Sequence, residues 1–146
     1  MAQPEPIIAL GPGAEGRGLT DMLATLLRQN LDEHADKRAA FARMVGRVAI
    51  VVSDLGSAIT LHFQGGRLTV HYGVMGIPDV TIRTSSEWLT KMSLVELEPR
   101  FGLPDLRNGA MAKEVGEAQK RGEIEMHGML LNLPLVLRLT QVMSVV

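Results

Sequence analysis

The sequence contains no cysteine, few aromatic residues and no marked excess of either charge. Without cysteine, the chain can form neither disulfide bonds nor thiolate sites for catalysis or metal binding. The formal net charge is -1 and the basic residues are spread along the chain, whereas nucleic-acid binding needs a clustered basic surface. We therefore expect no nucleic-acid partner.

The sequence also lacks a long apolar run. Its most apolar segment, residues 129–137, is interrupted by Asn132 and followed by Arg138, well short of the roughly 18 apolar residues that a membrane span requires. Residues 1–6 lack the positive segment and apolar stretch of a secretory signal. We therefore expect no transmembrane helix and a cytoplasmic location.

The length of 146 residues suits one domain with one hydrophobic core. Residues 1–18 are rich in proline and glycine and show no periodicity. We therefore expect a flexible leader over residues 1–18, followed by a single domain over residues 19–146.

The first half of that domain shows a change of period. Apolar residues recur every three or four positions over residues 20–42, as expected for one amphipathic helix or two in tandem. Apolar and polar residues then alternate in three segments, residues 48–52, 59–63 and 68–72. This alternation predicts three strands, and Gly65-Gly66 suits a two-residue turn between the last two. The expected result is an antiparallel meander.

The second half combines single strands with helices. A fourth strand is expected over residues 80–83, and Thr84 can cap the following helix while Glu87 reaches back to it. A polar helix over residues 108–121 and a fifth strand over residues 123–126 come next. The order of elements predicts an α+β fold.

The last expected helix, residues 133–143, is apolar nearly all round, and Asn132 and Pro134 are suited to its first turn. Such a helix must be covered on two sides, by the chain itself, by a partner chain or by a bound apolar molecule. The residues alone favour an ordinary buried helix or a dimer seam as much as a ligand site.

Three segments, taken in order, carry a family resemblance. They are the hairpin over residues 61–70, the sequence Asp79-Val80-Thr81-Ile82 followed by Ser85 or Ser86 and Trp88-Leu89, and the sequence Gly122-Glu123-Ile124-Glu125-Met126-His127-Gly128 before the final helix. Each segment alone matches many unrelated sequences, but the three in this order are more specific. From about Leu31 to Met143 the chain resembles the sterol carrier protein 2 (SCP-2) family.

The resemblance implies a twisted five-stranded, mostly antiparallel sheet with helices covering one face around an apolar tunnel. It implies a sterol, fatty acid or acyl chain as ligand, and neither catalytic residues nor a cofactor. The chain departs from the family in a longer stretch over residues 99–121 and in Met129, where a polar residue often follows the glycine. The expected tunnel walls are Trp88, Leu89, Met92, Met126, Leu130, Leu133, Val136 and Leu137.

Methionines are frequent, nine in all, and their unbranched thioethers adapt to irregular spaces. Four of them, Met92, Met126, Met129 and Met143, fall in the segments nearest the expected tunnel. For any one of them, filling of an ordinary core is an equally good explanation.

Other signals point to different chemistry with less support. Residues 11–16 match the G-x-G-x-x-G pattern of dinucleotide binding, but no second parallel strand with an acidic end follows. His62 and His71 are expected on one sheet face, with His127 as a third candidate, yet no ligand set for zinc is complete. No serine lies in a nucleophile elbow. We therefore expect neither a metal site nor catalysis.

The sequence thus predicts non-catalytic binding and carriage of an apolar small molecule such as a fatty acid or sterol. Transient membrane contact and a homodimer are left open. The alternative function is an interaction or accessory module that uses the apolar terminal helix as a dimer or partner interface and binds no small molecule.

Overall fold

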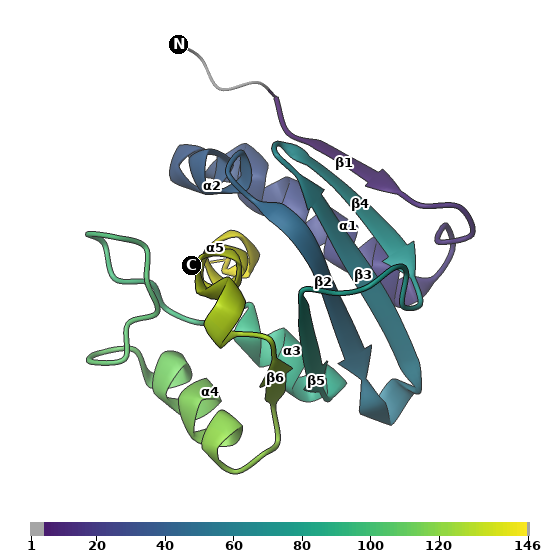
Figure 1. Cartoon of the computed structure of the whole chain (residues 1–146). Helices are drawn as coiled ribbons and strands as arrows, with labels where there is room; N and C mark the ends of the chain where they lie inside the picture. The colour runs from purple at the N-terminus through teal and green to yellow at the C-terminus, as the bar shows by residue number, and fades with distance from the viewer. Residues whose placement is uncertain (1–4, 146) are drawn as a thin grey trace.

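The computed structural model describes residues 5–145, whose strands form one six-stranded sheet in the spatial order β1-β4-β3-β2-β5-β6 (Figure 1). The strands are β1 (Ile7–Leu10), β2 (Val45–Val52), β3 (Ser57–Gln64), β4 (Arg67–Tyr72), β5 (Val80–Thr84) and β6 (Glu125–His127). Pairs β2-β3, β3-β4 and β5-β6 are antiparallel, whereas β1-β4 and β2-β5 are parallel. The expected α+β class is confirmed, with six strands instead of five.

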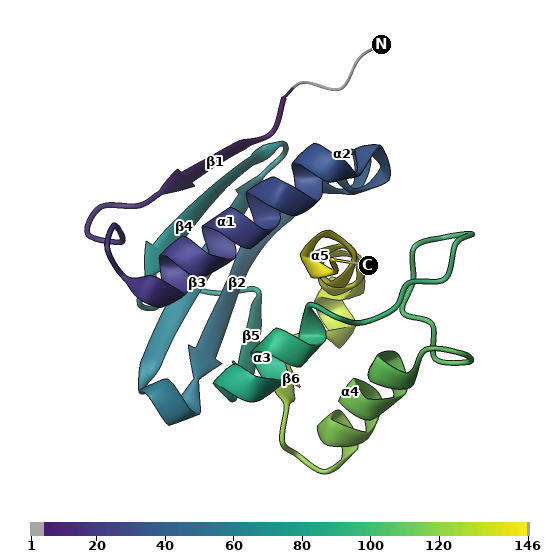
Figure 2. The ribbon, with the colours of Figure 1, turned by 180° about the vertical axis from the view of Figure 1, so that it is seen from behind.

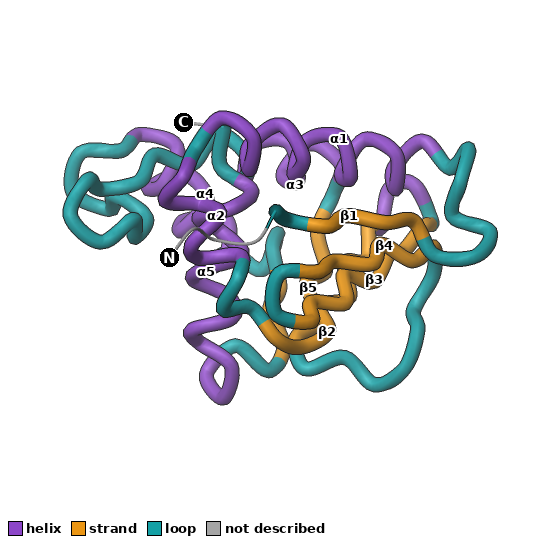
Figure 3. Tube along the Cα trace, turned by 90° about the horizontal axis from the view of Figure 1, so that it is seen from above, coloured by secondary structure: helices purple, strands orange, loops and turns teal. Residues whose placement is uncertain are grey.

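The helices cover one face of this sheet. They are α1 (Gly18–Glu33), α2 (Ala35–Phe41), α3 (Ser86–Met92), α4 (Ala110–Lys120) and α5 (Leu133–Met143), with short 3-10 turns η1 (Ser53–Leu55) and η2 (Leu130–Asn132). Seen from behind, α1 and α3 stand in front of the strands, and α5 lies beside them (Figure 2). The view from above shows α1 and α3 on one side of the strands (Figure 3). Within the described residues, no helix combines the length and apolar character needed to cross a bilayer.

The central meander follows the expected alternation. Thr60 pairs with His71 and His62 with Thr69, as the two-residue turn at Gly65-Gly66 predicts. The intervening residues Ile59, Leu61 and Phe63 are buried, because alternate side chains of a strand lie on opposite faces. They join the buried leucines of α1 in one core, in which Phe41 and Phe63 make an edge-to-face contact at 6.1 Å between ring centroids.

The expected leader differs from the structure at residues 7–10, which form the edge strand β1 alongside β4. The Gly11 backbone N–H donates to the Val70 carbonyl at 2.8 Å, and the Thr20 hydroxyl donates to the Ala14 carbonyl at 2.7 Å. The strand covers what would otherwise be the bare edge of β4. A continuous four-residue apolar run shows no alternation, which is why periodicity missed it. Residues 1–4 of the expected leader lie outside the described residues.

The start of α3 is capped one residue later than expected. Thr84 is the buried last residue of β5, and Ser85 is the N-cap, whose hydroxyl accepts a hydrogen bond from the Trp88 backbone N–H at 3.2 Å. Glu87 forms an ion pair with Lys91 at 3.3 Å instead of reaching back to the cap. The prediction of Thr84 as cap was wrong because β5 extends through that residue.

The helix and strand expected at residues 108–121 and 123–126 are present with shifted bounds. The backbone N–H groups of Glu123 and Ile124 both donate to the Ala118 carbonyl, at 2.9 and 3.4 Å, after Gly122 adopts a positive φ of 80°. The turn that ends α4 therefore occupies the first residues of the expected strand, and β6 begins only at Glu125.

Candidate ligand-binding cavity

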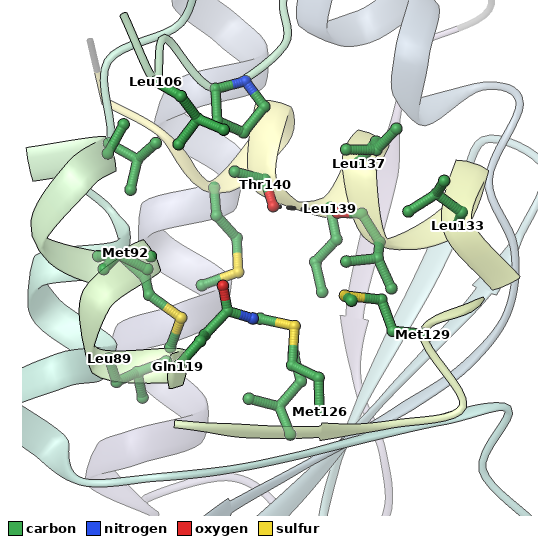
Figure 4. Close-up of a pocket in the computed structure, with 18 of the residues that line it drawn as sticks. Leu89, Met92, Leu106, Gln119, Met126, Met129, Leu133, Leu137, Leu139 and Thr140 are labelled. Atoms are coloured by element: carbon green, nitrogen blue, oxygen red, sulfur yellow. Dashed lines mark hydrogen bonds between the residues drawn. The ribbon is translucent and has the colours of Figure 1, made fainter. Parts of the chain in front are cut away.

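An apolar cavity of about 180 Å³ lies beside α5, between one side of the sheet and helices α3 and α4 (Figure 4). Its lining comprises Ile50, Ile82 and Met126 of the sheet; Leu89, Met92 and Val95 in and after α3; Pro104 and Leu106 before α4; Ala112, Val115, Gly116 and Gln119 of α4; and Met129, Leu133, Val136, Leu137, Leu139, Thr140 and Met143 at the end of the chain. Segments far apart in the sequence thus enclose one space.

The sheet contributes a row of three side chains. Ile50 in β2 pairs with Ile82 in β5, and Ile82 pairs with Met126 in β6. Residues paired across neighbouring strands place their side chains on the same face, so these three lie side by side beneath the helices. The parallel joining of β5 to β2 is what brings the row together.

Helix α5 is covered on both sides, as its all-round apolar sequence requires. Leu135 and Val142 are buried but do not line the cavity, and the buried Asn30 of α1 donates its amide N–H to the Val142 carbonyl at 2.9 Å. On the other side, Val136 and Leu137 line the cavity. The chain itself covers one side of the helix, and the cavity lies along the other.

Asn132 does not cap α5 with its side chain as expected. Its amide donates instead to the Asp79 carbonyl at 3.1 Å and the Gly128 carbonyl at 3.0 Å. These two bonds hold the η2-α5 junction against the start of β5. Because Pro134 in the first turn lacks an N–H, the helix start needs fewer capping acceptors.

Helix α4 forms the wall opposite the sheet and is held mainly at its N-terminus. The Glu96 carboxylate accepts hydrogen bonds from the backbone N–H groups of Met111 at 3.0 Å and Ala112 at 2.9 Å, and these bonds lower the pKa of Glu96. Lys91 of α3 pairs with Glu114 of α4 at 3.0 Å. The wall thus depends on polar contacts in the first half of α4 and on small apolar side chains along its inner face.

The lining is almost entirely apolar. Among the described residues that line the cavity none is charged, and the polar side chains are Gln119 and Thr140. The Thr140 hydroxyl donates to the Val136 carbonyl at 3.0 Å, within its own helix. The Gln119 amide extends into the space between α4 and α5 (Figure 4) and makes no hydrogen bond to residues 5–145. Gln119 is therefore the polar side chain that can both donate to and accept from a guest, while the Thr140 oxygen can accept only.

The structure brings together most of the residues expected as tunnel walls. Leu89, Met92, Met126, Leu133, Val136 and Leu137 all line the cavity. Trp88 lies outside the lining, with the Lys91 ammonium 4.6 Å from its ring centroid, because it is one position round the helix from Leu89. Leu130, in η2, is also outside it and is 86% exposed. As ligand contacts, all eight remain predictions.

The α4 wall is the part that sequence reasoning missed. Ala112, Val115 and Gln119 recur at helical spacing, but this apolar side is thin and gave no hint of what it covers. All four methionines singled out by position, Met92, Met126, Met129 and Met143, line the cavity. The residues of the stretch noted as long for the family, 99–121, thus supply Pro104, Leu106 and the whole of α4.

The histidine pair lies on the other face of the sheet. Burial lowers the pKa of His62, and the positive charge of Arg47 lowers it further. Over residues 5–145, no three histidine, cysteine or carboxylate side chains come close enough together to hold a metal ion.

Comparisons with known proteins address the fold. A model of the SCP-2 sterol transfer family matches residues 23–101. None of the curated proteins matches the sequence. A solved UbiJ-SCP2 ubiquinone synthesis protein is 17% identical with a TM-score of 0.61, covering 86% of this chain and 92% of its own. A crystal structure of sterol carrier protein 2 is 17% identical with a TM-score of 0.51, covering 84% and 91%.

An enzyme also contains this fold. The stereoselective inverting sec-alkylsulfatase from Pseudomonas sp. is 19% identical with a TM-score of 0.53, and the match covers 87% of this chain but 18% of that enzyme. At such identities these likenesses establish a shared fold alone.

Proposed function

The chain belongs to the SCP-2 sterol transfer family, and we propose that it binds and carries an apolar, lipid-like ligand in the cavity beside α5 without covalent chemistry. The observation that carries the proposal is an apolar cavity whose described lining holds no charged side chain. Burial of each methylene contributes about 0.8 kcal/mol, so such walls bind alkyl groups without a placed charge.

An empty apolar space is costly, which favours occupancy. At about 24 cal/mol per Å³, a void of 180 Å³ would cost about 4 kcal/mol, a large part of the stability of an ordinary domain. A ligand that fills the cavity offsets this cost. The protein is therefore expected to retain a bound lipid through gentle purification.

The volume of the cavity in this structure limits the size of ligand that fits without rearrangement. Its 180 Å³ is close to the roughly 150 Å³ of an engineered cavity that accepts benzene, and below the ~300–1,000 Å³ of pockets for drug-sized ligands. A sterol or long acyl chain would require the space to widen. We assign the widening to α4, because this helix lies outside the sheet and the contacts from Glu96 and Lys91 both hold its first half.

The polar lining favours a ligand whose polar group is neutral. A buried carboxylate without a cationic partner is strongly disfavoured, whereas the Gln119 amide can both donate to and accept from a hydroxyl or carbonyl group. A sterol hydroxyl or an esterified acyl chain suits this arrangement. A free fatty acid would keep its carboxylate outside the cavity.

Catalysis has no support in the lining. The Thr140 hydroxyl is engaged with the backbone of its own helix, and within residues 5–145 the cavity holds no general base beside it. The alternative function, an interaction module without a ligand, rests on the exposed Leu130 and Leu131 before α5.

Gly116 offers a direct test of occupancy. It lines the cavity from the middle of α4. Apart from its two chain neighbours and the backbone of its own helix, no described atom lies within 4 Å of the position that a Cβ would take. Gly116→Leu is expected to fill the space and abolish binding of a fluorescent fatty-acid probe. Gly116→Ala is the matched control. It stabilises the helix by the same amount, about 1 kcal/mol, but adds only one methyl group to the cavity.

Two outcomes would contradict the proposal. One is an unliganded mass in native mass spectrometry together with no binding of the probe by the unmodified chain. The other is probe binding that Gly116→Leu leaves unchanged, which would place the ligand outside the cavity.

A further inference from the structure

The turn before α5 presents apolar side chains to solvent. Leu130 is 86% exposed and Leu131 is 91% exposed, while Val45 at the start of β2 is 71% exposed. Val45 and Leu131 line one shallow depression together with Pro134. We call Val45, Leu130 and Leu131 the apolar tip. Leucines this exposed at adjacent positions are characteristic of a surface that contacts something apolar.

Two arginines flank the apolar tip. Arg43 and Arg138 line the same depression as Val45 and Leu131. Neither guanidinium forms a hydrogen bond or ion pair with the described residues. The acidic side chain beside this surface, Asp79, accepts a hydrogen bond from the Arg47 backbone N–H at 2.8 Å. Asp79 keeps its negative charge, so Arg43, Arg138 and Asp79 together carry an excess of one positive charge beside the tip.

The apolar tip adjoins the cavity. Met129 and Leu133, which precede and follow η2 in the chain, both line the cavity. A guest that leaves between these two residues passes directly beside Leu130 and Leu131. A guest that leaves by this route therefore first meets whatever the tip contacts.

We propose that the apolar tip inserts into the interface of anionic membranes, with Arg43 and Arg138 at the lipid phosphates, and loads the cavity from there. Leucines on a protruding turn can reach the boundary of the acyl chains while flanking arginines stay among the headgroups. The two arginines beside the exposed leucines complement anionic headgroups, which favours a membrane as the partner. The loading role rests on the proposed function.

Vesicle sedimentation tests the proposal. The full chain is expected to bind vesicles of equal parts phosphatidylcholine and phosphatidylglycerol, and to bind phosphatidylcholine alone more weakly. The double variant Leu130→Ser/Leu131→Ser is expected to bind the anionic vesicles at least tenfold more weakly. Arg43→Ala/Arg138→Ala is expected to lose most of the preference for the anionic vesicles, as added salt does in the unmodified chain.

The controls lie away from the tip. Leu55→Ser changes a leucine that is 53% exposed in η1, at the opposite end of β2 from Val45, and Arg107→Ala removes an exposed arginine from the loop before α4. Both are expected to bind vesicles as the unmodified chain does. If they weaken binding as much as the tip variants do, the effect is non-specific and the proposal is wrong.

Probe binding in vesicle-free solution separates this proposal from the proposed function. The tip variants should keep their affinity for the fluorescent fatty-acid probe, since neither leucine lines the cavity. If the chain binds the probe but no vesicles, the membrane proposal fails and the cavity proposal stands. A dimer that dissociates on Leu131→Ser would make the tip a protein interface and would also overturn the membrane proposal.

Discussion

The two ends of the sheet are covered by helices of different kinds. Over β3 and β4 lies α1, whose Leu23, Leu27 and Leu31 are all buried in the core. Beside β5 and β6, the wall facing the sheet is α4, which offers Ala112, Val115 and Gly116 and leaves a cavity. Large side chains on a long helix close the first region, and small ones on a short helix leave the second open. On the proposed function, stability and binding are divided between two ends of one sheet.

The largest expected effect tests whether the packed region carries the stability. Leu27→Ala should lower the free energy of unfolding by about 3 kcal/mol, since it creates a new void in a filled core. Leu137→Ala should cost less than half as much, because Leu137 already borders empty space. Urea unfolding measures both. Equal losses would show that the two regions do not differ in packing.

Ligand binding should reduce the contrast between the regions. A neutral lipid at about 100 times its Kd should raise the free energy of unfolding by about 2.7 kcal/mol. In the Gly116→Leu variant the same addition should have no effect, because the side chain occupies the space. Thermal unfolding with and without lipid is the measurement, and an equal rise in both proteins would contradict the assignment of the cavity.

The Glu96 cap should make the open region sensitive to acid. Hydrogen bonds from the Met111 and Ala112 N–H groups lower the pKa of Glu96 in the folded state. Its stabilisation is therefore complete above the unfolded pKa of about 4.3 and is lost as the pH falls through the lower folded pKa. Glu96→Ala should cost about 1 kcal/mol, the usual value of a capping side chain.

Hydrogen exchange localises this acid effect. Amides of α4 should exchange faster at low pH and in Glu96→Ala at neutral pH, while amides of α1 stay protected. Asp21→Ala, at an acidic residue in the first turn of α1 that lies far from α4, is the matched control. Equal acceleration in α1 and α4 would mean that the acid acts on the whole fold.

The smallest expected effect concerns ligand selectivity. Gln119→Leu should change the free energy of unfolding by no more than about 0.5 kcal/mol, since the side chain is half-buried and forms no hydrogen bond to residues 5–145. The affinity for a lipid with a hydroxyl group should fall about five- to tenfold, the usual value of one hydrogen bond. Affinity for an alkane probe of equal length should be unchanged. A loss for both would assign Gln119 a purely steric role.

Much of the fold follows from local pattern. Alternation at Ile59, Leu61 and Phe63 and the glycine pair at 65–66 predict the meander and its register, because each depends on residues close in the sequence. The start of α3 was displaced by one residue, since Thr84 and Ser85 can both cap a helix and the choice depends on where β5 ends. Strand β1 was missed because its pairing partner lies about 60 residues away along the chain.

The candidate site was predicted in part. Residues on the final helix and in α3 were expected at the walls, and six of the eight line the cavity. Trp88 and Leu130 do not, because one position along a helix or turn redirects a side chain by about 100°. Gln119 had no distinguishing local signal, since a glutamine on a polar helix is ordinarily solvent-exposed.

The amino-acid sequence by itself determined the strands of the meander, the amphipathic first helices and the apolar terminal helix, because hydrophobic period and turn chemistry act over a few residues. Only the tertiary structure decided that α4 stands away from the sheet and that Ile50, Ile82 and Met126 face it across a cavity. A cavity is the space that packing leaves unfilled. It depends on side chains brought together from distant segments, and no single segment encodes it.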